Sequence, residues 1–198
     1  MVLYAALAMP LLTAALLFRL TKEPLFGRLN LVGAVVTSAL LILVILNADD
    51  ILFKTHSFLY VDSLSAVILA VVAVLNVTAA LASVTYMERE THEASLSVAD
   101  LKRYYILLNI FIFSMICVPV VENLGLLWVA VEATTLASAL LVAFSFSRAA
   151  IEAAWKYVMI CTVGLCLGLL GTILLYSAQL SVSQVDADAL SWLALMKV

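Results

Sequence analysis

The chain has 198 residues, of which 66% are hydrophobic and 12% are charged, and its formal net charge at pH 7 is −3. A soluble domain has roughly 45–50% apolar and about 25% charged residues, so this composition excludes an ordinary soluble protein and indicates a membrane protein. The small net charge gives no sign of nucleic-acid binding.

Six long apolar segments predict an all-α fold, an integral membrane bundle of about six helices in a single domain covering residues 1–198. Segments of this length cross the hydrocarbon core as helices at about 1.5 Å per residue, and they lack the alternation of barrel strands. We do not expect the first to be a cleavable signal, because no positive residue precedes it in this sequence. A periplasmic tail, 179–198, is expected to follow the six spans, which run approximately Val2–Phe18, Leu29–Leu46, Ser63–Tyr86, Tyr104–Val121, Leu124–Phe146 and Tyr157–Ala178.

The loop charges predict the orientation of these spans. Lysine and arginine gather in the loops after the first, third and fifth spans, and cytoplasmic loops carry such an excess. Both termini are therefore expected on the outer, periplasmic side. The eight cationic residues of the inner side are Arg19, Lys22, Arg28, Arg89, Lys102, Arg103, Arg148 and Lys156, against Lys54 and Lys197 outside.

Polar residues around the third span have mainly structural interpretations. Asp62 precedes the span, where an acid favours a helix N-terminus, so we expect a helix cap. Asn76 and Thr78 lie inside the span and are expected to form hydrogen bonds between helices. No motif for flavin, an iron–sulfur cluster, nickel, another metal or nucleotide is evident, since the cysteines lack paired spacing and the two histidines lie in loops on opposite sides.

Glu132 is the most informative residue, because it lies in a 23-residue apolar segment with no other charge. A carboxylate there costs roughly 2.5–3.5 kcal/mol on insertion scales, and intramembrane acids usually relay protons or hold ions. A protonated glutamate that only bonds a neighbouring helix is the alternative. At about 100° per residue, Trp128 and Thr135 share the Glu132 face, while Ala130 and Ala137 fall opposite.

The sixth span contributes a second charged candidate, Lys156, near its cytoplasmic end. Lys156 is interpreted either as an anchor that reaches the headgroups, paired with Glu152 four residues earlier, or as part of a proton path. Further along, Gly164, Gly168 and Gly171 share one side of the helix and indicate a close helix contact.

Two segments carry a resemblance to a known family. The run NLGLLWVAVEATTLAS (123–138), followed by EAAWKY (152–157), closely resembles the antiporter-like subunits of respiratory complex I and related enzymes. The match is nearest to the hydrogenase-4 and formate hydrogenlyase group. YVDSLSA (60–66) is similar to the start of that family's third span, and the resemblance covers most of residues 60–178.

The resemblance implies a proton-pumping module in which Glu132 belongs to a charged relay along the membrane midplane. Lys156 matches the lysine that family members carry at the start of the sixth span. Such members continue into further spans with an inverted repeat and additional lysines. The chain is thus identified with the N-terminal six-helix half, and either a separate subunit supplies the rest or this chain is a shortened building block.

The expected function is that of a membrane subunit in a proton-translocating redox complex of the bacterial or archaeal inner membrane, of the hydrogenase or NADH–quinone oxidoreductase type. Glu132 would accept protons, with Lys156 as a supporting cation. Polytopic membrane subunits and peripheral redox subunits would be the partners, the latter carrying iron–sulfur clusters, flavin or a nickel–iron centre. Two alternatives stay open, part of a multisubunit cation/proton antiporter and a purely structural subunit.

Overall fold

The computed structural model describes residues 1–20, 23–47, 59–93 and 97–182. Six of its helices are long and apolar enough to cross a membrane. The all-α prediction and the number of spans are thereby confirmed, and the chain is a multi-pass membrane protein.

The helices extend further than the apolar segments from which they were predicted. Helix α2 begins at Glu23 rather than near Leu29, α4 continues to Glu93, and α7 begins at Arg148. Apolar residues mark only the hydrocarbon crossing, while the charged residues that flank them are themselves good helix formers. The bounds are α1 (Val2–Arg19), α2 (Glu23–Leu46), α4 (Ser63–Glu93), α5 (Val98–Cys117), the 3₁₀ turn η1 (Val118–Val120), α6 (Leu124–Val142) and α7 (Arg148–Val182).

Helix α6 is shorter than predicted and ends at Val142 instead of Phe146. Phe146 has a φ of 51°, in the left-handed region that stops a helix and turns the chain. The turn feeds directly into α7.

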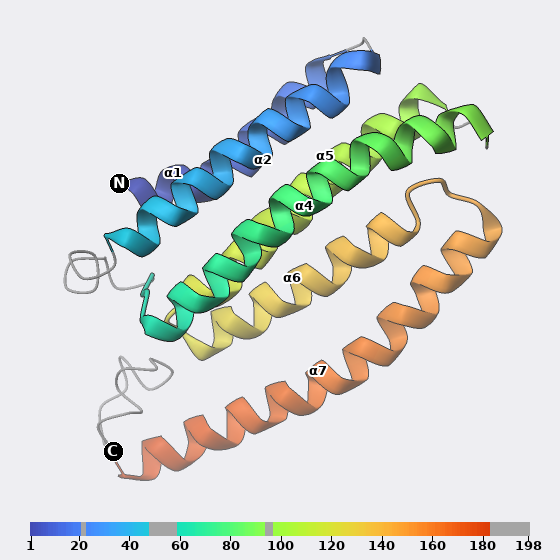
Figure 1. The fold of residues 1–198 in the computed structure, drawn as a ribbon. Helices are drawn as coiled ribbons and strands as arrows, with labels where there is room; N and C mark the ends of the chain where they lie inside the picture. Colours follow the sequence, from blue (N-terminus) through green and yellow to red (C-terminus); the bar gives the residue numbers. More distant parts are fainter. Residues whose placement is uncertain (21–22, 48–58, 94–96, 183–198) are drawn as a thin grey trace.

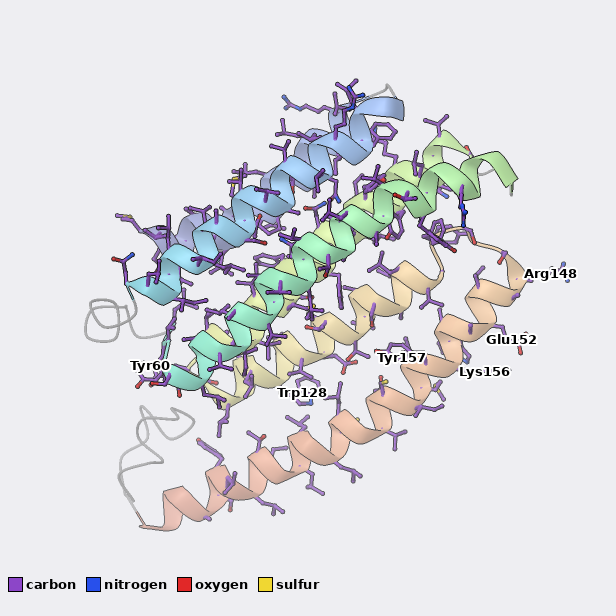
Figure 2. All side chains as sticks on the ribbon, viewed as in Figure 1. Tyr60, Trp128, Arg148, Glu152, Lys156 and Tyr157 are labelled. Atoms are coloured by element: carbon purple, nitrogen blue, oxygen red, sulfur yellow. The ribbon has the colours of Figure 1, made fainter. Side chains whose placement is uncertain are left out.

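The helices form a bundle with an appended hairpin (Figure 1). Helices α1, α2, α4 and α5 pack together, α6 packs on α5, and α7 packs on α6. Because six crossings alternate in direction, α1 begins and α7 ends at the same end of the molecule. We call this the Tyr60 end and the opposite one the Arg148 end, after residues labelled in Figure 2. Which end faces the cytoplasm remains a prediction.

Two apolar clusters close the ends of the four-helix bundle and enclose polar side chains between them. At the Tyr60 end the cluster is built around Leu41, Leu69 and Ile116, and at the Arg148 end around Leu17 and Phe26. The buried polar residues on the intervening helix faces include Thr13, Asn30, Ser38, Asn76 and Asn109.

One of the two hydrogen-bonding predictions for the third span is confirmed. Asn76 on α4 donates to the Ala34 carbonyl at 3.1 Å and to Ser38 Oγ at 3.2 Å, both on α2. The prediction was wrong for Thr78, whose exposed hydroxyl bonds carbonyls of its own helix. A threonine often satisfies itself against the preceding turn in this way.

The predicted cap of α4 is present. The Ser65 backbone N–H donates to Asp62 Oδ1 at 2.6 Å. Burial opposes ionisation of this carboxyl, but the hydrogen bonds from Ser65 and its neighbours outweigh burial and hold the Asp62 pKa below its usual value.

Candidate proton site at the α6–α7 interface

Helix α6 is fixed at its start by Asn123, whose side-chain oxygen accepts from the N–H groups of Gly125 and Leu126 at 2.9 and 3.2 Å. An asparagine at this position satisfies donors that have no partner in the first turn. One turn later the indole of Trp128 reaches across to α7 and donates to the Leu165 carbonyl at 2.9 Å. These contacts set the register in which α6 meets α7.

Glu132 lies at this interface, one turn beyond Trp128 and on the same face of α6. Thr162 Oγ1 of α7 donates to Glu132 Oε1 at 3.4 Å. The other carboxyl oxygen, Oε2, is buried and has no hydrogen-bond partner in the described part of the chain. On the other faces of the helix, Ala130 and Ala137 are buried.

A pair of hydroxyls joins the same two helices nearer the Arg148 end. Ser138 Oγ and Tyr157 Oη are 3.1 Å apart, and Figure 2 shows Tyr157 and Trp128 in the space between α6 and α7. The six residues between Glu132 and Ser138 correspond to about 9 Å along the helix. The α6–α7 interface thus holds three polar contacts at successive levels, with the carboxyl in the middle.

The structure does not bring Lys156 to Glu132. Lys156 Nζ lies 2.5 Å from Glu152 Oε1, and both side chains are about two-thirds exposed. Lys156 precedes Thr162, the contact of Glu132, by six residues, about 9 Å along α7 and on a different face. The pair with Glu152 is the one expected for an anchor at the headgroups.

A cleft of about 380 Å³ lies on the other side of α6, toward α4 and α5. Most of its lining residues are apolar, and the hydroxyl-bearing ones are Thr134, Thr135, Ser138 and Tyr157. Ser138 and Tyr157 therefore border both the cleft and the α6–α7 interface.

The glycines of α7 do not face α6. A Cβ added at Gly164, Gly168 or Gly171 would meet no atom of the described chain within 4 Å. The predicted glycine face is open, so the described residues do not supply the close helix contact that this spacing favours.

Sequence reasoning selected Glu132 and missed its neighbours Thr162 and Ser138. A lone threonine in an apolar span resembles any small residue that packs helices. What would have identified Thr162 is the antiparallel register of α6 and α7, which the Trp128–Leu165 contact sets.

No protein-family profile matches the chain. It is similar to a hydrogenase-4 component F homolog of Methylacidiphilum infernorum (isolate V4), with 32% identity over 145 residues, 72% of this chain and 30% of the relative. The chain therefore spans less than a third of that relative's length.

The fold is similar to a chain in the structure of the membrane-bound sulfane sulfur reductase, an archaeal respiratory membrane complex. The TM-score is 0.70 at 19% sequence identity, and the match covers 89% of this chain and 37% of the other. The arrangement of α1 to α7 is thus one already seen in a respiratory membrane complex.

Proposed function

We propose that this chain, an antiporter-like membrane subunit by its similarity to the hydrogenase-4 component F homolog, serves a respiratory complex in a bacterial or archaeal plasma membrane. Its role there is to provide a proton site at Glu132. Electron-transfer centres belong to partner subunits, and other membrane subunits pack beside this one.

The observation that carries the proposal is the environment of the Glu132 carboxyl. Oε1 has a single long contact with a hydroxyl, and Oε2 is buried without a donor among the described residues. A buried carboxylate is stable only when hydrogen-bond donors or a cation satisfy its charge, whereas a neutral carboxylic acid needs fewer such partners. The Glu132 carboxyl therefore has an acceptor position that water or a neighbouring helix could fill, and an exchangeable partner of this kind is what a proton relay requires.

Hydroxyls offer a route toward this carboxyl. Tyr157 and Ser138 lie at the Arg148 end of the interface and Thr162 contacts Glu132, so water between them would complete a chain of hydrogen bonds. In this arrangement Lys156, paired with Glu152, acts at the membrane surface. Its influence on Glu132 would be through charge at a distance rather than through contact.

The test is Glu132→Gln in membranes that contain the assembled complex. Glutamine keeps size and hydrogen bonding but carries no acidic proton, so assembly is expected to survive while most of the proton translocation per turnover is lost. Proton uptake into vesicles and redox turnover are measured on the same preparation. Glu122→Gln, which removes a carboxylate two residues before the start of the same helix, is the matched control and is expected to pump normally.

Full pumping by the Glu132→Gln variant would refute the proton-site proposal and leave a structural role. Proton flux that requires a monovalent cation and no redox substrate would instead identify an antiporter.

A further inference from the structure

A groove runs between α1 and α2 at the Arg148 end of the molecule, where α1 ends and α2 begins. Its volume is about 420 Å³, within the range of about 300–1,000 Å³ that small-molecule sites occupy. The lining residues are three or four positions apart on each helix, so each helix contributes one stripe. They are Leu16, Arg19 and Leu20 of α1 and Leu25, Arg28, Leu29 and Val32 of α2.

The groove opens away from the rest of the bundle. Its apolar residues Leu16 and Val32 are 52% and 60% exposed, whereas Leu17 and Phe26 face the interior and pack with residues of α4 and α5. Figure 1 shows α7 on the opposite side of the molecule. An open apolar surface at this position in a membrane protein is covered by lipid chains or by another membrane helix.

Two arginines line the groove beside this apolar wall. Arg19 is the last residue of α1, and Arg28 lies in the first turn of the apolar crossing that begins at Leu25. At about 1.5 Å per residue, Val32 is about 6 Å further along α2 than Arg28. The groove therefore changes from charged to apolar over about the 5–8 Å thickness of a headgroup layer.

Neither arginine has a carboxylate partner in the described part of the chain, where the ion pairs are those within α5 and within α7. Among the described residues, no acid lines the groove. In the sequence from 16 to 32 the single acid, Glu23, is outnumbered by three cations. This end of α1 and α2 thus has an excess of positive charge that attracts anions.

A lysine of α5 takes over a task that a basic residue at the end of α1 often performs. Lys102 Nζ donates to the Leu20 carbonyl at 3.0 Å and to the Phe18 carbonyl, and it lies 5.2 Å from the centroid of the Phe18 ring. Basic side chains near a helix C-terminus commonly bond its last carbonyls in this way. Because Lys102 satisfies these carbonyls, the exposed guanidinium of Arg19 is available for a ligand.

We propose that the groove binds one anionic phospholipid of the leaflet at the Arg148 end. Its phosphate is bound by Arg19 and Arg28, and an acyl chain lies along Leu16 and Val32. Guanidinium groups match phosphate oxygens in bidentate geometry, and basic pockets between membrane helices bind anionic headgroups. A zwitterionic lipid fits less well, because its headgroup cation meets the same positive charge.

The test titrates the detergent-solubilised full chain with phosphatidylglycerol or phosphatidylcholine and reads the fraction that carries one lipid by native mass spectrometry. We expect one phosphatidylglycerol to bind in preference to phosphatidylcholine. Arg19→Gln and Arg28→Gln are each expected to weaken this binding about fivefold, equivalent to about 1 kcal/mol for a cation near an anionic headgroup. Arg148→Gln removes an exposed arginine at the same end but outside the groove, so this matched control is expected to bind as tightly as the original protein.

Two further measurements separate a lipid from a soluble phosphate. Val32→Trp obstructs the apolar wall and keeps both arginines, so it is expected to weaken phosphatidylglycerol binding. Val35→Trp, at an exposed valine outside the groove, is its control and is expected to have no effect. Glycerol phosphate carries the headgroup charge without acyl chains, so an excess of it is expected not to displace the lipid.

Equal affinity for the two lipids would overturn the proposal, and this comparison uses the unmodified protein and so does not depend on the folding of any variant. Equal weakening by Arg148→Gln and Arg28→Gln would also overturn it, because the attraction would then belong to the whole charged surface. Displacement by glycerol phosphate would assign the arginines to a soluble phosphate instead. If Arg28→Gln left lipid binding unchanged but removed a membrane subunit from the purified complex, the groove would be a protein interface.

Discussion

Replacing Gly33 by alanine tests how closely α1 and α2 approach. A Cβ at position 33 would lie 2.2 Å from Thr13 Cγ2 and 3.1 Å from Thr13 Cβ. Atoms do not approach this closely, so either Thr13 must rotate or the two helices must separate. Thr13 is not free to rotate, because its hydroxyl is held by Asn109 and by the Pro10 carbonyl.

The expected cost follows from these two responses. Overpacking a buried contact costs about 1–3 kcal/mol, and rotating Thr13 would leave the Asn109 oxygen unpaired at a similar cost. Alanine stabilises a helix by roughly 0.5–1 kcal/mol relative to glycine, and this offsets part of the overpacking cost. We therefore expect Gly33→Ala to lower the free energy of unfolding by about 1–2 kcal/mol.

The assay is a denaturant titration of the purified protein in mixed micelles, with the free energy of unfolding taken by linear extrapolation. Thr13→Ser removes Cγ2 and keeps the hydroxyl, so the double variant Thr13→Ser/Gly33→Ala is expected to recover most of the loss. The coupling energy of this cycle should reach about 1 kcal/mol, as for residues in direct contact. The close approach of α1 and α2 would be refuted if Gly33→Ala had the same free energy of unfolding as the original protein. It would also be refuted if the double variant were no more stable than Gly33→Ala alone.

The remaining predictions concern a helix cap, an interface and the topology. Asp62→Ala is expected to cost about 1 kcal/mol through loss of the α4 cap, whereas Asp62→Asn keeps the cap. Because the Asp62 pKa is lowered in the folded state, the stabilisation by its carboxylate is present above the usual pKa of 3.8 and is lost as the pH falls below that value. In thermal melts at decreasing pH, the midpoint of the original protein should therefore fall more than that of the Asn variant. Gly168→Leu is expected to reduce co-purification of partner membrane subunits without destabilising the isolated chain, and normal assembly would mean that the glycine face contacts lipid. Cysteines substituted at Ser147 and Asn47 are expected to react with impermeant thiol reagents from the inner and outer sides respectively, and labelling of both from one side would contradict the topology.

The spans and the position of Glu132 were predictable from the sequence because both follow from polarity along the chain. A 23-residue apolar segment predicts a membrane-spanning helix, and a single acid within it can be recognised as a candidate site without knowing its contacts in the fold. The cap at Asp62 and the pairing of Asn76 were predictable for the same reason, since each depends on where a helix begins or on polarity inside a span.

The pairing of residues across helices was not predictable. Whether Lys156 meets Glu132 depends on helix rotation and register, and the local i,i+4 bond to Glu152 satisfies the lysine instead. Thr78 likewise bonds its own backbone rather than a second helix. A polar residue in a span predicts that a hydrogen bond will form but leaves the partner open.

The two parts of the chain differ in how their buried polar groups are satisfied. In the four-helix bundle, amides and hydroxyls pair across α1, α2, α4 and α5, and such groups keep their charge unchanged. At the α6–α7 interface the polar group is a carboxyl with one oxygen unpaired in the described chain, on a hairpin whose outer helix has no buried residues along its most apolar stretch. A carboxyl can exist with or without its proton, whereas amides and aliphatic hydroxyls keep theirs. The proposed proton site at Glu132 is therefore chemically unlike the buried groups of the bundle, and α5 of the bundle provides the surface on which α6 packs.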